Sequence, residues 1–113
     1  RRGMARSDVH RHVAANLRLR PEDRRSPVVA TEFVCTSVTS RGLSEAVMAA
    51  IRASNPDLVH ARSDQRGYAL IELTPAGASC DFRATPFPAQ AEARLHSQAR
   101  FQVEAGRAGV VRD

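Results

Sequence analysis

The sequence contains no lysine and no tryptophan, and aromatic residues make up only 4 % of it. So few rings exclude a surface on which successive nucleobases stack. All 17 basic residues are arginines, and they are spread along the chain. The net charge of +5 is therefore weak support for a nucleic-acid partner, because no basic stripe concentrates it.

Cysteine is scarce, and long apolar runs are missing. Cys35 and Cys80 are too few for a disulfide framework. They can pair in an oxidising compartment, but two buried free thiols are the favoured interpretation. No apolar run is long enough to span a membrane. The first arginines are followed by Asp8 and His10 rather than by an apolar segment, so we expect no signal peptide.

The length of 113 residues fits one domain or a portion of a larger one. Apolar residues at helical spacing predict a helix at residues 9–19, stopped by Pro21. The β-branched run at residues 28–34 predicts a strand. Residues 43–53 predict a second helix, which ends at Asn55-Pro56.

A hairpin is predicted in the second half of the chain. Residues 68–73 and 78–84 flank Thr-Pro-Ala-Gly at 74–77, and proline at the second and glycine at the fourth position are typical of a type I turn. The residues expected in the core are Leu70 and Phe82, or Ile71 and Cys80 if the register slips by one.

The end of the chain predicts one more strand and a tail. In residues 95–103, Ala99, Phe101 and Val103 alternate toward one face. Residues 107–113 are expected to form a disordered tail. The elements together predict an α+β fold with two helices.

Residues with metal-ligand chemistry cluster at residues 8–12, Asp-Val-His-Arg-His. A carboxylate and an imidazole two residues apart project to the same side of an extended segment, and both are good metal ligands. Alone, the pattern is weak, because an Asp-x-His triplet on a solvated surface is the more common outcome.

For the other polar residues, non-catalytic roles compete with functional ones. Ser37 and Ser40 have no identifiable activating base, which favours a polar loop. Arg66 is either a phosphate-binding residue or a surface residue at the start of a strand. His60 and His96 are expected at the surface or half-buried.

An ordered set of segments is more specific than any one of them. Residues 7–12, 23–34 and 36–40 are followed at consistent spacing by Asn55-Pro56, Arg66-Gly67-Tyr68 and residues 101–107. The set resembles PhoD-type alkaline phosphatases, with their G-D-V-H-x-H, D-x-x-S-P-V-V-A-T-E-F-V, T-S-I-T/S-S, N-P-H, R-G-Y and F-V-V-E-x-G-R-P-G segments. The resemblance covers nearly the whole chain from Ser7 onward.

This resemblance implies a fold and an activity. Residues 1–113 would be a single C-terminal portion of a calcineurin-like metallophosphoesterase, an α/β/β/α sandwich of mostly antiparallel strands with two flanking helices. The family hydrolyses phosphate monoesters and diesters with clustered metal ions, iron with calcium, which polarise phosphoryl oxygens and activate hydroxide. Its members are typically exported.

The resemblance also implies roles for the clustered residues. Asp8 and His10 would be metal ligands, and His12 would support the ligands or face the substrate. Ser7 and Cys35 stand where the family has glycine. The family motif ends an apolar strand, which residues 1–6 are expected not to form, and the other ligands lie in the upstream portion of the fold. We therefore expect this chain to be inactive alone, with the missing upstream portion as a partner.

Two alternatives belong to other classes of protein. One is a non-catalytic remnant or small binding module without metal chemistry. The other, less favoured, is a basic nucleic-acid-binding domain. Metal titration separates the phosphatase from the remnant, and a strongly salt-dependent DNA affinity would favour the third interpretation.

Overall fold

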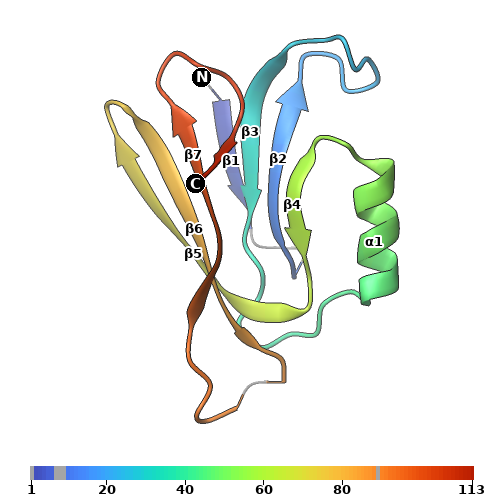
Figure 1. Cartoon of the computed structure of the whole chain (residues 1–113), viewed down its shortest axis with the longest axis vertical. Helices are drawn as coiled ribbons and strands as arrows, with labels where there is room; N and C mark the ends of the chain where they lie inside the picture. The colour runs from blue at the N-terminus through green and yellow to red at the C-terminus, as the bar shows by residue number, and fades with distance from the viewer. Residues whose placement is uncertain (1, 7–9, 89) are drawn as a thin grey trace.

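Two four-stranded sheets pack face to face, and a helix lies against the outer side of the first sheet (Figure 1). The computed structural model describes residues 2–6, 10–88 and 90–113. The first sheet has the order β1-β3-β2-β4 and the second β5-β6-β7-β8. The elements are β1 (Arg2–Arg6), β2 (His12–Arg18), β3 (Val28–Val34), α1 (Glu45–Ser54), β4 (Leu58–Arg62), β5 (Gln65–Thr74), β6 (Gly77–Pro86), β7 (His96–Glu104) and β8 (Val111–Arg112). All neighbouring strands are antiparallel except β1 and β3.

The core has two layers. Between the sheets, Ala14 and Phe33 of the first sheet meet Phe82 and Phe101 of the second. On the other side of the first sheet, α1 buries Met48 completely against a second apolar cluster. The first half of β2 is therefore covered on both faces, which is why it reads as a nearly continuous apolar run.

The helix α1 has clear end signals. The Ser44 side chain accepts a hydrogen bond from the backbone N–H of Val47, and Glu45 in the first turn complements the helix dipole. The helix ends at Asn55, one residue before Pro56. The predicted second helix is thus confirmed within two residues at each end.

Residues 9–19, predicted as a helix, instead contain strand β2, so the structure has one helix among its described residues. The apolar residues Val13 and Leu17 fit a helical spacing, but together with Ala15 they also fit the two-residue period of a strand. Pairing with β3 and β4 satisfies the backbone of β2 on both sides, and burial on both faces hides the usual polar alternation.

The expectation that residues 1–6 form no strand is also wrong. Residues 2–6 form β1, which runs parallel to β3 at the edge of the first sheet. Charged residues are common on edge strands, because only one side of such a strand is paired. The amino-acid composition of residues 1–6 therefore did not predict strand β1.

The predicted hairpin is confirmed, with Ile71 opposite Cys80 and Ala69 opposite Phe82. The core assignment was half right. Phe82 and Cys80 are buried at 0 % and 1 % exposure, whereas Leu70 and Ile71 are 51 % and 37 % exposed. The difference follows from the sheet order, because β5 is the edge strand of the second sheet, whereas β6 lies between β5 and β7 (Figure 1).

The C-terminal segment 107–113, expected to be disordered, includes strand β8, which pairs with β7. The backbone N–H of Val110 also donates to the side-chain oxygen of Asn16 over 2.9 Å. The Arg112 guanidinium lies 5.5 Å from the centre of the Phe101 ring. These contacts fix a segment whose sequence carries no strong local signal.

Both cysteines are free, as expected, with Cys80 buried and Cys35 half-buried. Burial raises the pKa of the Cys80 thiol to about 12, so this thiol stays protonated and unreactive at neutral pH. No helix in the described part of the chain is long and apolar enough to cross a membrane.

Candidate metal-ligand loop

The predicted ligand segment lies where the chain enters β2. Asp8 falls outside the described residues, so its placement stays a prediction. His10 is half-exposed and has a φ of 48°, in the left-handed region that non-glycine residues rarely adopt. Two residues later, His12 begins β2 and is completely buried. The two histidines therefore have different surroundings.

The ring of His10 is oriented by a backbone carbonyl. Its Nδ1 lies 3.3 Å from the carbonyl oxygen of Arg41. A carbonyl only accepts, so Nδ1 carries the proton in this contact and Nε2 of the neutral ring keeps a lone pair. Histidine ligands of metals are commonly oriented by such a contact. His10 is therefore suited to supply one metal ligand.

The ring of His12 is fully engaged within the protein. Its Nδ1 accepts a hydrogen bond from the backbone N–H of Thr36 over 3.3 Å, and its Nε2 donates to the carbonyl of Arg83 over 3.1 Å. Burial lowers the pKa of His12 to about 4, so the ring is neutral at pH 7. Of the two roles expected for His12, support of the neighbouring loop fits this geometry, since facing a substrate requires an exposed ring.

Arg66 is the residue near this loop whose role the sequence left open. It is fully buried, not at the surface. Its Nη1 donates to the His10 carbonyl (3.1 Å), the Ser37 hydroxyl (2.9 Å) and the Ser40 carbonyl (2.8 Å). Its Nη2 donates to the Ser63 carbonyl over 2.5 Å. One guanidinium thus joins three connecting segments of the chain.

The segment around Gly42 packs closely on this guanidinium. A Cβ at Gly42 would lie 2.1 Å from Ser63 Oγ and 2.6 Å from Arg66 Nη2. Ser63 Oγ itself accepts from the backbone N–H of Leu43 and donates to the His10 carbonyl. Only glycine fits at position 42 without displacing these groups.

The other histidines differ from one another. His60 is buried, donates from Nε2 to the side-chain oxygen Oε1 of Gln98 over 2.7 Å, and stacks on Phe82 with ring centres 5.7 Å apart. It is a core residue rather than the surface or half-buried residue expected. His96 is exposed, as expected. A core role for His60 was not visible, because Gln98 is distant in sequence.

No group of three or more His, Cys, Asp or Glu side chains that could hold a metal occurs among residues 2–6, 10–88 and 90–113. Iron with calcium needs many more ligands than one Asp and one His. The fit is therefore partial: His10 suits one coordination position, and a complete centre requires groups from outside the described residues.

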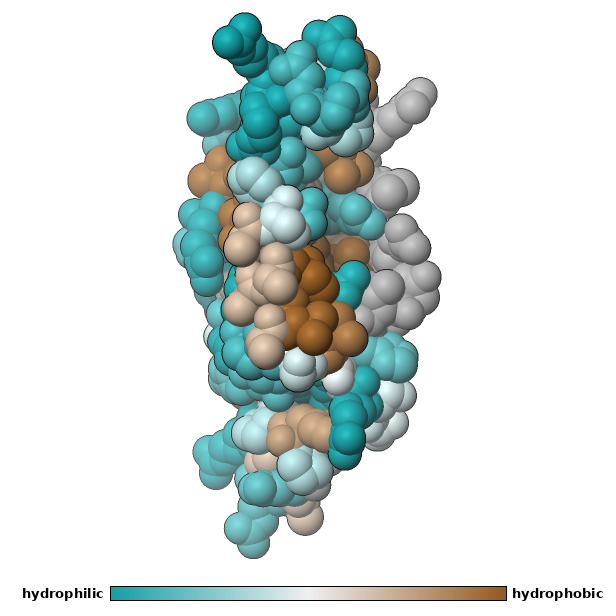
Figure 2. Space-filling view, turned by 90° about the vertical axis from the view of Figure 1, so that its right-hand side faces the viewer, coloured by the Kyte–Doolittle hydropathy of each residue, from teal (hydrophilic) through white to brown (hydrophobic). Residues whose placement is uncertain are grey.

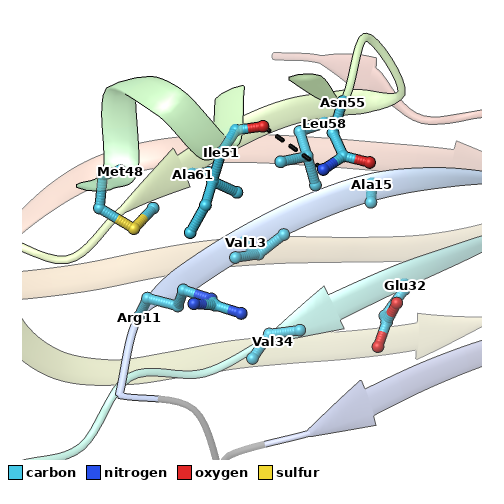
Figure 3. Close-up of a pocket in the computed structure, with 10 residues that line it drawn as sticks. All are labelled: Arg11, Val13, Ala15, Glu32, Val34, Met48, Ile51, Asn55, Leu58 and Ala61. Carbon is cyan, nitrogen blue, oxygen red and sulfur yellow. Dashed lines mark hydrogen bonds between the residues drawn. The ribbon is translucent and has the colours of Figure 1, made fainter. Parts of the chain in front are cut away.

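An apolar groove lies on the other face of β2, beside α1 (Figure 2). Val13, Ala15 and Val34 form its floor, and Met48 and Ile51 of α1 form one wall (Figure 3). Arg11, Glu32, Asn55, Leu58 and Ala61 complete the lining. The ring of His12 contacts Phe82 on the opposite side of the sheet, whereas Arg11, the residue between His10 and His12, lines the groove.

A sequence model of the PhoD-like phosphatase family matches residues 5–82, and the chain belongs to this family. Alkaline phosphatase D of Bacillus subtilis (strain 168) is 32 % identical over 106 residues, which are 91 % of this chain and 18 % of that protein.

The solved structure of PhoD matches with a TM-score of 0.80 and 26 % identity, over 97 % of this chain and 22 % of that one. The chain thus spans about a fifth of the length of the relatives it matches. The expected α+β portion of the phosphatase fold is confirmed, with one described helix instead of two.

Proposed function

We propose that this chain is the C-terminal portion of a metal-dependent phosphoesterase and supplies one arm of its metal site, Asp8 and His10. The observation that carries the proposal is the His10 ring, held at Nδ1 by the Arg41 carbonyl with Nε2 left for a ligand bond. The match to PhoD over nearly the whole chain supports it.

Iron with calcium are the ions that the family resemblance implies, and when bound they supply Lewis-acid activation of the phosphoryl group and of water. The residues of this chain have simpler tasks. Asp8 and His10 would bind the metal ions, and the Arg41 carbonyl orients the His10 ring. Neutral His12 joins β2 to β6 through its hydrogen bond to the Arg83 carbonyl. Phosphate esters are the proposed substrates.

The remaining portion of the phosphatase domain is the proposed partner, and it would dock on the groove. One helix, about 10 Å wide, covers about two strands spaced about 4.8 Å apart. Since α1 packs on β4, the outer face of β3 is left open where Glu32 and Val34 line the groove. The occupant we propose is a helix from that remaining portion, because the chain spans about a fifth of its relatives.

We expect the isolated chain to show no phosphatase activity, because its described residues cannot complete a metal centre. The assay is hydrolysis of a generic phosphomonoester at alkaline pH with iron and calcium supplied. A chimera in which this chain replaces the matching segment of the Bacillus subtilis relative should be active, and Asp8→Ala should abolish that activity. Ile51→Glu in the chimera should disturb docking at the groove and lower the yield of active enzyme.

Two results would contradict this proposal. One is turnover of about 1 per second or more by the isolated chain that disappears with Asp8→Ala. The other is a folded chimera whose activity is unchanged by Asp8→Ala. The first would show a complete site within the chain, and the second a site that does not use this arm.

Metal binding by the isolated chain should be weak and should depend on His10. We expect calorimetric titration with a divalent metal at neutral pH to give a Kd above about 1 μM, equivalent to less than about 8 kcal/mol. His10→Ala should remove the binding, whereas His96→Ala, at another exposed histidine, should leave it unchanged. Tight binding that survives His10→Ala would place the site elsewhere.

A further inference from the structure

We propose that Arg66 is a positioning residue: its buried guanidinium holds the backbone of His10 in its left-handed conformation and so helps to place the ring that would bind a metal ion. This inference rests on the proposed function, because it concerns the arm of the metal site that Asp8 and His10 form. Arg66 itself touches neither metal nor substrate in this account.

The guanidinium holds connecting segments rather than strands. Its partners lie before β2 (His10), between β3 and α1 (Ser37 and Ser40) and between β4 and β5 (Ser63). The Phe87 ring, from the connection after β6, lies 5.7 Å from the guanidinium carbon. Four connections therefore converge on one side chain at the end of the sandwich where His10 lies.

The conformation of His10 explains why such a clamp is needed. A φ of 48° is unfavourable for a residue with a Cβ and persists only where the surroundings impose it. The carbonyl of His10 accepts from both Arg66 Nη1 and Ser63 Oγ, at 3.1 and 3.2 Å. These two bonds fix one of the two peptide groups that flank the strained His10 Cα, and so help to hold the conformation.

The free-energy cost of burying the Arg66 guanidinium argues against a purely structural role for this residue. Within the part of the chain that the structure describes, no carboxylate pairs with Arg66, and its Nε is buried without a hydrogen-bond partner. Burying a charge without an opposite charge is costly, and an apolar residue of similar size is often at least as stabilising. Burial lowers the pKa of Arg66, and the attraction of the Asp64 carboxylate, which pairs with Arg62, only partly offsets this.

The same geometry excludes direct phosphate binding by Arg66. Its side chain is fully buried, and both terminal nitrogens already donate to the protein. A phosphate would have to displace the Ser40 and Ser63 carbonyls to reach them. Lysine cannot replace this residue, because it lacks the planar fork that lets one group serve several acceptors in fixed directions.

The test compares Arg66→Met and Arg66→Lys with the matched control Arg62→Met, which removes a half-exposed arginine paired with Asp64. In metal-free protein, the three-bond HN–Hα coupling and the 13Cα shift of His10 report its φ by NMR. We expect both Arg66 variants to lose the left-handed signature at His10 while the β6 and β7 amides keep their shifts. Divalent-metal affinity should fall by about tenfold or more, and Arg62→Met should change neither.

Unchanged His10 coupling and shift in the Arg66 variants would overturn the inference, whatever happens to metal binding. The same holds if Arg62→Met has an equal effect. If Arg66→Met does not fold, the Arg66→Lys data decide, because this variant keeps the charge and loses only the fork. If the wild type binds no metal, the proposed function is wrong, but the inference about Arg66 is still tested, because the NMR signature of His10 is measured without metal.

Discussion

Replacing Phe82 by alanine is expected to lower the free energy of unfolding by about 3–5 kcal/mol. Phe82 is fully buried at the centre of the ring cluster between the sheets. Its ring centre lies 4.6 Å from that of His12, 5.7 Å from that of His60 and 6.0 Å from that of Phe101. Because these neighbours come from both sheets, they cannot close together over the space that the ring leaves. Urea denaturation followed by circular dichroism measures the change.

The matched control is Tyr68→Ala. Tyr68 is an aromatic residue of the neighbouring strand β5, but it is 44 % exposed. Its removal should cost less than about 1 kcal/mol, as is usual for surface positions. Equal losses for the two variants would mean that the Phe82 cluster is not the centre of the core.

The parts of the fold that could be predicted have local signals. Strand β3 is a run of β-branched and apolar residues, the β5–β6 hairpin has Pro75 and Gly77 at its turn, and α1 has Ser44 before it and Asn55 after it. Each of these signals lies within a few residues of the element it defines. Strand β2 has none, because its burial on both faces is created by α1 and by the second sheet.

The candidate site likewise contains residues that the sequence predicts and residues that it does not. The Asp-x-His spacing at residues 8–10 is visible in sequence, and the ordered set of segments led to the correct family. The supporting residues were not visible. Arg66 donates to carbonyl groups that lie between 3 and 56 positions away in the sequence. His12 contacts Thr36 and also donates to the carbonyl of Arg83, which lies 71 positions further along the chain. Such partners are brought together only by the sheet topology, so a polar residue of the core resembles a surface residue when it is read alone.

Protonation of His12 should destabilise the metal-free protein as the pH falls below 6.5. The folded state keeps this ring neutral down to a pKa of about 4, because burial disfavours the charged form, while the unfolded chain takes up the proton near 6.5. The unfolded state therefore binds more protons between these values, and stability decreases as the pH falls through this range. Since one pKa unit corresponds to about 1.4 kcal/mol, the loss amounts to about 3 kcal/mol. Burial lowers the pKa of His60 as well, which acts in the same direction.

His12→Gln separates this effect from the titration of other groups. A glutamine amide can accept from the Thr36 N–H and donate to the Arg83 carbonyl, as the neutral ring does, but it does not ionise in this range. With EDTA present, urea denaturation at pH 7 and at pH 4.5 should show a clearly smaller loss of stability for His12→Gln than for the wild type. His60 titrates in both proteins, so the difference between them reports His12 together with its repulsion by His60. Identical losses would show that His12 is charged in the folded protein, and its bond to the Arg83 carbonyl would then be one that an imidazolium makes equally well.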